Sequence, residues 1–173
     1  MLEIKKLTAT DGEDIFEMLQ EMPADENGFV NSVYGKTYEE YKVWLAKSEV
    51  DSKQSGLIDG WKVPQTTFWL YENGKPVGMG KIRHFLTDAL RSAGGNIGYA
   101  IRPSERGRGL GKRFAGLLID GARKMNIPEM LITVHDDNIA SVKAALANGG
   151  TIEKVENGRY YISVPSESIG CAR

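Results

Sequence analysis

The sequence has very few of the residues that form disulfides, metal sites and catalytic thiols. It contains one cysteine, Cys171, and two histidines, His84 and His135, among 173 residues. A single cysteine cannot form an internal disulfide, and its place near the C-terminal end argues against a catalytic role. No pair of potential ligands has the spacing of a zinc site, such as CxxC or HxxxH. We therefore expect no metal and no catalytic cysteine.

Long apolar runs and an excess of one charge are also missing. The longest apolar run, around residues 117–119, is far shorter than the ~20 residues of a membrane-spanning helix, and the N-terminus lacks the apolar core of a signal peptide. The 22 Lys and Arg residues balance 23 Asp and Glu residues, whereas nucleic acids and anionic membranes are normally bound by a basic excess. We expect a cytoplasmic monomer or homodimer with a small partner molecule.

The length and the 41% hydrophobic content suit one domain over residues 1–173. Alternating apolar residues predict strands at about 2–7, 66–71, 76–84, 96–102, 130–134, 151–155 and 159–164. Apolar residues at helical spacing predict helices that begin at the capping boxes Thr10-x-x-Glu13 and Thr37-x-x-Glu40, after Gly109, and at Asn138. Residues 23–35, 48–64 and 85–95 are predicted loops. This order predicts an α+β fold in which helices cover both faces of one mixed sheet.

Local sequence patterns predict two hairpin turns and the buried face of the last helix. Asn73-Gly74 and Asn157-Gly158 lie between strand-like runs and predict tight hairpin turns, because both turn residues need positive φ. On the last helix, Ile139, Val142 and Leu146 repeat at helical spacing and are predicted to face inward.

A glycine-rich segment, residues 106–111, lies between a predicted strand and a predicted helix. Its backbone amides point toward whatever binds at the helix N-terminus, and glycines let an anion approach the backbone closely. Arg106, Arg108, Lys112 and Arg113 add positive charge, which suits a pyrophosphate. The alternative is an ordinary glycine-rich turn with a solvated basic face. The order of strand, proline, glycines, cations and helix favours a phosphate site.

Two common phosphate motifs do not fit this segment. The P-loop GxxxxGK[ST] fails because Arg106 and Arg113 stand where glycine and Ser/Thr are required. The dinucleotide motif GxGxxG fails because Lys112 replaces the last glycine, and because the segment follows a hairpin rather than opening a βαβ unit.

The pattern that does fit is [Q/R]-x-x-G-x-[G/A], matched by Arg106, Gly109 and Gly111. With the strand 96–102, Pro103 and the downstream Asn138-x-x-Ser141, the chain resembles the GNAT superfamily of acyl-CoA-dependent acetyltransferases over nearly its whole length. Residues 98–106 are similar to a group of predicted acetyltransferases within it. The resemblance implies a three-layer α/β/α fold around a mixed, mostly antiparallel sheet.

The resemblance also implies acetyl-CoA as cosubstrate and no metal. It places the pantetheine arm beside the backbone of Ile101 and beside Asn138 and Ser141, where Asn138 can also act as helix N-cap. It assigns the pyrophosphate to Arg106, Gly107, Arg108, Gly109, Leu110, Gly111 and Lys112.

The implied reaction is direct attack of a primary amine, on a small molecule or a peptide, on the thioester. An alkylamine with a pKa of about 10.4 is under ~0.1% neutral at pH 7, so a base is needed. His84 and Glu26 are the catalytic candidates, and Tyr99 could act through water. His84 has a suitable pKa, whereas Glu26 lies in the first interhelical loop, where the acceptor site of the family would lie. His135 is predicted to be structural.

One position departs from the pattern of the family. Seven residues after Asn138, where many members carry a tyrosine that protonates the leaving thiolate, this chain has Ala145. The strand 96–102 also lacks the glutamate that some relatives use as base. A non-catalytic acyl-CoA sensor or interaction module is therefore the alternative. The acceptor, the general base and acid, the acyl length and the oligomeric state remain open at this point.

Overall fold

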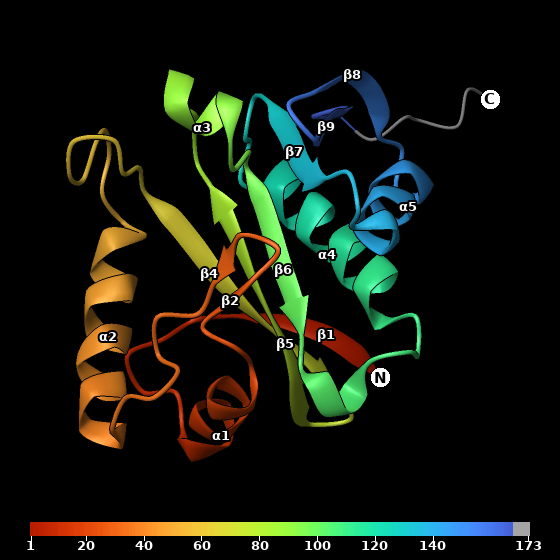
Figure 1. Cartoon of the computed structure of the whole chain (residues 1–173). Coiled ribbons are helices and arrows are strands. Elements are labelled where there is room, and N and C mark those ends of the chain that lie inside the picture. The colour runs from red at the N-terminus through yellow and green to blue at the C-terminus, as the bar shows by residue number, and fades with distance from the viewer. Residues whose placement is uncertain (168–173) are drawn as a thin grey trace.

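A computed structural model of the chain describes residues 1–167, so the prediction for Cys171 lies outside the described part. The helices are α1 Glu13–Glu21, α2 Tyr38–Asp51, α3 Asp88–Ser92, α4 Leu110–Lys124 and α5 Ile139–Ala147, with a 3-10 turn at Pro103–Glu105. The strands are β1 Leu2–Lys6, β2 Asp25–Glu26, β3 Phe29–Val30, β4 Gln65–Glu72, β5 Lys75–Arg83, β6 Ile97–Ile101, β7 Met130–His135, β8 Thr151–Glu156 and β9 Arg159–Val164 (Figure 1).

The strands form two main sheets and one small hairpin. The first sheet has the order β1-β4-β5-β6, the second has the order β7-β9-β8, and β2 pairs with β3. All of these pairs are antiparallel. Helices α1 and α2 cover one side and α4 and α5 the other (Figure 1), which confirms the three-layer α+β fold. The sheet is split rather than continuous, because β6 and β7 belong to different sheets; the isolated bridge from Gly95 to Ile132 and the hydrogen bonds of Gly94 and Asn96 to β7 lie just before β6 begins.

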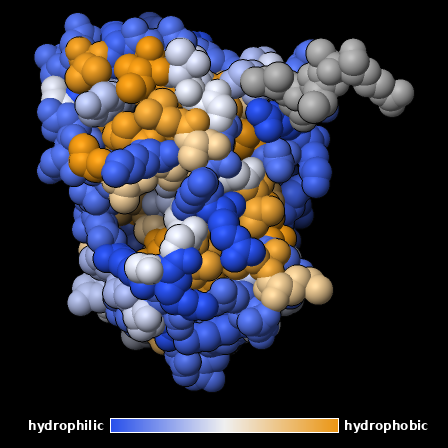
Figure 2. Space-filling model, turned by 90° about the vertical axis from the view of Figure 1, so that its right-hand side faces the viewer, coloured by the Kyte–Doolittle hydropathy of each residue, from blue (hydrophilic) through white to orange (hydrophobic). Residues whose placement is uncertain are grey.

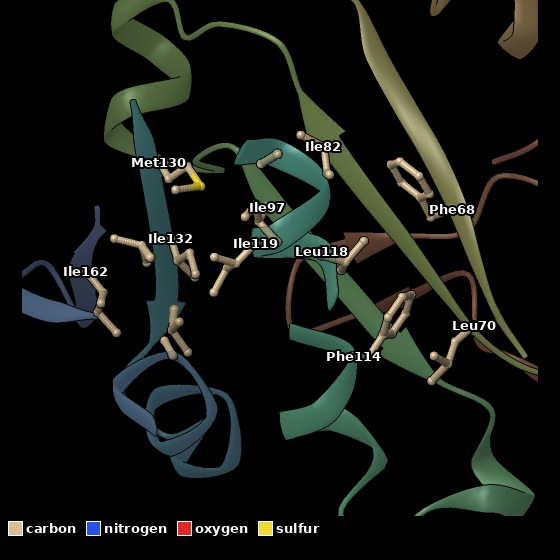
Figure 3. Packing of buried hydrophobic residues seen from close by; sticks show 14 of the residues in the cluster. Phe68, Leu70, Ile82, Ile97, Phe114, Leu118, Ile119, Met130, Ile132 and Ile162 are labelled. Atoms are coloured by element: carbon tan, nitrogen blue, oxygen red, sulfur yellow. The ribbon is translucent and has the colours of Figure 1, made fainter. Parts of the chain in front are cut away.

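Helix α4 packs its apolar stripe between the two sheets. Phe114, Leu118 and Ile119 lie against side chains of both sheets, including Ile82 and Ile132 (Figure 3). The helix approaches β5 closely at Gly80, where an added Cβ would lie 2.7 Å from a Leu118 methyl carbon. The site described below depends on this contact, because it fixes the start of α4 relative to the sheet.

The opposite layer rests on aromatic side chains. Trp69 and Met79 belong to a second buried cluster with the apolar faces of α1 and α2. Tyr41 of α2 is fully buried and donates a hydrogen bond of 3.1 Å to the carbonyl of Gly12. Successive side chains of β4 and β5 point to opposite faces of the sheet, so these two strands contribute buried residues to the clusters on both faces.

The two predicted capping boxes have different outcomes. The Thr37 box is confirmed, because the Thr37 hydroxyl accepts from the Glu40 amide at 3.2 Å and the Glu40 carboxylate accepts from the Thr37 amide at 2.8 Å. The Thr10 box is wrong: α1 begins after Gly12, which makes no side-chain capping bond. Asp11 instead accepts from the Thr8 amide and from the indole of Trp69. A contact with a distant strand thus replaces the local cap.

Helix α5 is rotated relative to the predicted face. Val142 is buried as predicted, but Ile139 and Leu146 are 48% and 40% exposed, so the prediction for these two is wrong. The buried face is instead formed by Val142 and the small residues Ala144 and Ala145. Small side chains let α5 lie close to α4, where the Asn148 amide donates to the carbonyl of Lys112 at 3.0 Å.

Two predicted loops contain short elements. Residues 23–35 include the β2–β3 hairpin, which turns at Asn27-Gly28 with φ of 53° and 82°. Residues 85–95 include α3, whose N-cap Thr87 accepts from the Leu90 amide. The turns at Asn73-Gly74 and Asn157-Gly158 are confirmed, with positive φ at all four residues.

Candidate active site

A cleft of about 950 Å³ opens where β6 and β7 part. Its walls come from both sides of the sheet, and the side of the molecule that carries α4 and α5 is visibly hollowed, with hydrophobic residues beside a hydrophilic surround (Figure 2). We call one part of it the donor end, lined by Gly107, Gly109, Leu110, Gly111, Lys112, Asn138 and Ser141. We call the other the acceptor end, lined by Phe29, Val30, Trp61, Lys81, Arg83, Leu90, His135 and Arg159.

The N-terminus of α4 is left open at the donor end. Its N-cap is Gly109, which has φ of 73° and offers no side-chain cap, and the first turn has no acidic residue. At Gly107 and Gly109 an added Cβ would meet nothing within 4 Å, so the backbone borders free space. Unpaired amides at a helix start attract an anion. The residues present therefore fit a phosphate group.

The edge of β6 supplies further free backbone groups. Arg102 donates to Val77 and Arg83 donates to the carbonyl of Asn96, so the even-numbered residues of this stretch bond to β5. The backbone N–H groups of Tyr99 and Ile101 consequently point toward the parted β7. An extended ligand arm can bind there as an additional strand would.

The arginines of the glycine-rich segment are held by carboxylates of the same chain. Arg106 makes a bidentate ion pair with Glu26, at 2.8 and 2.5 Å, and donates from Nε to the carbonyl of Ile101 at 3.0 Å. Arg108 pairs with Glu105 and Glu72, both at 2.6 Å. Lys112 lines the cleft without a carboxylate within 4 Å among residues 1–167.

The start of α5 forms another wall of the donor end. Asn138 caps the helix as predicted: its side chain accepts from the Ser141 amide at 3.4 Å and donates to the Ser141 hydroxyl at 3.1 Å. Ala145, one turn further on, also lines the cleft. Between α4 and α5 lies Tyr99, whose ring makes an edge contact with Phe114 at 5.8 Å. Burial raises the pKa of Tyr99, and a hydrogen bond with Ser141 opposes this shift.

The residues proposed as bases lie in different places. Glu26, on β2, lines the cleft. His84 is not among the lining residues; its Nε2 lies 2.8 Å from the Thr66 hydroxyl, and burial together with the charge of Lys6 lowers its pKa. His135 lies in the cleft at the end of β7, with Nε2 3.5 Å from Arg159.

The sequence patterns did not single out the cations of the acceptor end. Lys81 donates to the carbonyl of Val30 at 2.6 Å, and its ammonium lies 4.8 Å from the ring centre of Phe29. Arg83 donates to the carbonyl of Gly95 at 2.9 Å. Burial, helped by the charges of Arg83 and Lys62, lowers the pKa of Lys81 to about 8. The available signal was a lysine and an arginine two residues apart on an otherwise apolar strand.

Within residues 1–167, no three His, Cys, Asp or Glu side chains are grouped so that they could hold a metal ion. Over the same range, every helix is too short or too polar to cross a membrane.

Residues 1–151 match the protein family described as "Acetyltransferase (GNAT) domain". The chain therefore belongs to the GNAT acetyltransferase family. It is an acetyltransferase that uses acetyl-CoA, and the resemblance read from residues 96–141 is confirmed. A search of curated proteins gave no match.

Solved structures share the fold at low sequence identity. A GNAT-family acetyltransferase from Streptococcus pneumoniae has a TM-score of 0.61 at 20% identity, with 95% of this chain and 100% of that one covered. Campylobacter jejuni N-acetyltransferase PseH in complex with acetyl coenzyme A has a TM-score of 0.62 at 14% identity, with 96% and 100% covered. A spermidine N-acetyltransferase SpeG chimera from Vibrio cholerae and hSSAT has a TM-score of 0.62 at 14% identity, with 95% of each chain covered.

Proposed function

We propose that this chain transfers the acetyl group of acetyl-CoA to a primary amine, on a small molecule or a peptide, by direct attack of the amine. The observation that carries the proposal is one continuous cleft that runs from the open N-terminus of α4 to the opposite side of the sheet. Such a passage lets two substrates meet from opposite sides in a position that favours reaction.

The donor end has groups that fit the pyrophosphate and the pantetheine arm of acetyl-CoA. The backbone amides of Leu110, Gly111 and Lys112 would bind the pyrophosphate, with Lys112 adding charge. The outward amides of Tyr99 and Ile101 would hold the pantetheine arm in extended form, beside Asn138 and Ser141. Bound there, acetyl-CoA supplies an activated acetyl group as a thioester.

The acceptor amine must lose a proton before or during attack. Glu26 lines the cleft, although both of its oxygens are engaged by Arg106. His135 also lines it, from the end of β7. His84 is bonded to Thr66 outside the lining. We therefore propose Glu26, with His135 as the second candidate, and assign His84 a structural role.

The leaving thiolate must gain a proton, and Ala145 cannot supply it. We propose Tyr99 as the donor. Its hydroxyl lies near Ser141, one helical turn before Ala145 on the same face of α5, so it approaches the place that a tyrosine at 145 would reach. Because burial raises its pKa, Tyr99 keeps its proton at neutral pH.

A thiol-release assay tests the proposed function. The protein is given acetyl-CoA and a panel of primary amines, and free thiol is measured against amine-free protein. We expect release that depends on at least one amine, with an N-acetylated product of the matching mass. Acetyl-CoA binding without amine-dependent release by any member of a broad panel would favour the sensor alternative and overturn the proposal.

A further inference from the structure

We infer that the acceptor amine carries a carboxylate, and that it is a small amino acid-like molecule with an apolar side chain whose acid group binds at Lys81 and Arg83. This inference rests on the proposed function and narrows it to one class of acceptor.

The two cations share the side of the sheet opposite to the donor end. They alternate along β5 with Gly80 and Ile82, which face α4. Because successive side chains of a strand point to opposite faces, Lys81 and Arg83 point away from α4, and Arg83 donates to the carbonyl of Gly95. The contact of Lys81 with Phe29 and Val30 agrees with this placement. These charges are therefore separate from the phosphate-binding start of α4.

The charges of Lys81 and Arg83 have no counter-ion in the described part of the chain. Neither is within 4 Å of a carboxylate of residues 1–167, and each donates one hydrogen bond, to a backbone carbonyl. An ammonium has three donors and a guanidinium five, so most of their donors remain available. Both side chains are partly buried, and a buried charge is costly unless it is paired. An anionic ligand would supply the missing partner.

The carboxylates of the cleft do not compete for this position. Glu26 and Glu105 are the acidic residues among those that line it. Glu26 lies opposite Phe29 in the β2–β3 hairpin, but both of its oxygens accept from Arg106, and Glu105 pairs with Lys75 and Arg108. Arg159 adds a further cation near His135 at the acceptor end. A polyamine would place its extra positive charges against this group, and like charges at short range repel. The acceptor end thus favours an anionic amine over a polycationic one.

The remaining walls of the acceptor end are apolar. Phe29 packs across β6, where an added Cβ at Gly98 would lie 3.3 Å from its ring. Leu90 is a buried lining residue, while Val30 and Trp61 line the cleft and are exposed. A guanidinium can bind a carboxylate through two parallel hydrogen bonds, which also fixes the orientation of the ligand. An apolar side chain can lie on the aromatic wall while the acid group is held in this way.

Matched substrate pairs test the inference on the unaltered protein. L-tryptophan, L-leucine and L-alanine are each compared with the corresponding amino acid amide, and spermidine is included. The amide has the same side chain and a less basic amine, so an advantage of the acid cannot come from easier deprotonation. We expect kcat/KM for the best acid to exceed that of its amide by at least about 10-fold, as loss of a charged hydrogen bond would give.

Charge-removing variants assign the effect to the two residues. Lys81→Met and Arg83→Gln should each lower kcat/KM for the acid by about 10-fold and leave the amide within about 2-fold. Lys62→Met is the matched control, because it removes an exposed neighbouring charge that does not line the cleft. It should leave the ratio of acid to amide unchanged. Circular dichroism melting confirms that each variant is folded.

A binding measurement separates this inference from the proposed function. The melting temperature is measured with N-acetyl-L-tryptophan and with N-acetyl-L-tryptophanamide, and the other N-acetyl pairs follow. We expect stabilisation by an acid and less by its amide, even if no amine releases thiol, in which case only the proposed function fails. Equal kcat/KM values and equal shifts in melting temperature for acids and amides, or a higher kcat/KM for spermidine, would overturn the inference. Amine-dependent thiol release would still support the proposed acetyltransferase activity.

Discussion

At the donor end of the cleft the arginines form ion pairs with carboxylates of the same chain, whereas at the acceptor end Lys81 and Arg83, within residues 1–167, donate only to backbone carbonyls. Arg106 is held by Glu26, and Arg108 by Glu72 and Glu105. Positive charge near a cleft therefore has two uses in this molecule. Paired arginines brace the loop that presents the α4 amides, and unpaired cations remain available to a ligand. The contrast predicts that backbone geometry dominates binding at one end and side-chain charge at the other.

The strongest test of the backbone-dominated end is Gly109→Glu. The substitution puts a side chain where φ is 73° and a negative charge where the phosphates would lie. We expect acetyl-CoA, but neither NAD nor ATP, to raise the melting temperature of the unaltered protein, and the variant to lose this shift together with at least about 100-fold of its thiol-release rate.

Gly35→Glu is the matched control for this substitution. Gly35 also has positive φ, of 77°, and also borders free space, but it does not line the cleft. It should incur a similar backbone strain and keep the acetyl-CoA shift. Stabilisation of the unaltered protein by NAD alone, or full acetyl-CoA binding by Gly109→Glu, would contradict the role given to the glycines.

The second test asks whether Glu26 is only a partner of Arg106 or also the base. If it takes the proton of the amine, Glu26→Gln should lower kcat by about 10²-fold, a usual share for general base catalysis, without weakening acetyl-CoA binding. The acid limb of its pH profile should flatten. Arg106→Gln breaks the same ion pair but keeps the carboxylate, so it should lower kcat much less than Glu26→Gln does.

Two histidine variants complete the comparison. His84→Ala should keep kcat, because His84 lies outside the cleft lining. Equal losses in Glu26→Gln and Arg106→Gln would show that the ion pair alone matters. A large loss in His135→Ala, with activity retained in Glu26→Gln, would assign the base to His135.

The difference between the two ends also explains how far the sequence could be read. The phosphate-binding part of the donor end is formed by consecutive residues: the end of a strand, a proline, glycines and the start of a helix. The sequence of residues 96–111 was therefore enough to predict it. Asn138 and the Thr37 box are local signals too, and both are confirmed as caps. Asn27-Gly28 is an equally local turn signal, but the strands that it joins have only two residues each, too few to show an alternating apolar pattern.

The acceptor end could not be predicted in this way, because it is assembled from distant segments. Which side of β5 faces the cleft depends on how the β2–β3 hairpin folds across the sheet. The same limit explains the wrong helix start at Thr10, where Asp11 is engaged by Trp69, 58 residues away in sequence. The inward face of α5 depended on its packing against α4, which apolar spacing alone did not reveal.

The third test compares how much an ion-paired cation and an unpaired cation of the donor end contribute to acetyl-CoA affinity. Lys112→Gln should weaken acetyl-CoA binding by about 5- to 10-fold, because an available ammonium bonds phosphate strongly. Arg108→Gln should weaken it by less than about 3-fold, since its charge is already shared with two carboxylates at the surface. Titration calorimetry at one fixed salt concentration measures both. A larger loss for Arg108→Gln would show that its side chain leaves its carboxylates to bind the ligand.

The smallest expected effect concerns the ion pair between Glu21 and Arg102, which lies just before the glycine-rich segment. Glu21 of α1 accepts hydrogen bonds from Arg102 and from the Ser104 amide. Burial alone would raise the pKa of Glu21, but these bonds outweigh it and hold the pKa at about 2, below the ordinary value of 4.5. The folded-state pKa is depressed, so the stabilisation is complete above about pH 4.5 and is lost as the pH falls toward 2.

We expect Glu21→Gln to lower the melting temperature by about 2–6 °C at pH 7, since one partly exposed charged contact contributes about 1–2 kcal/mol in a chain of this size. Near pH 2.5 the gap between the variant and the unaltered protein should be clearly smaller, because the carboxylate is then almost fully protonated in the unfolded chain and partly protonated in the folded one. Acetyl-CoA affinity at pH 7 should change little, because the bracing residues do not themselves bind the phosphates. A gap in melting temperature that stays constant from pH 7 to pH 2.5 would mean that the Glu21 charge does not stabilise the fold. A large loss of acetyl-CoA affinity with unchanged stability would place the Glu21–Arg102 pair in the binding site. The proposal that ion-paired arginines at the donor end support the loop without binding the phosphates would then be wrong.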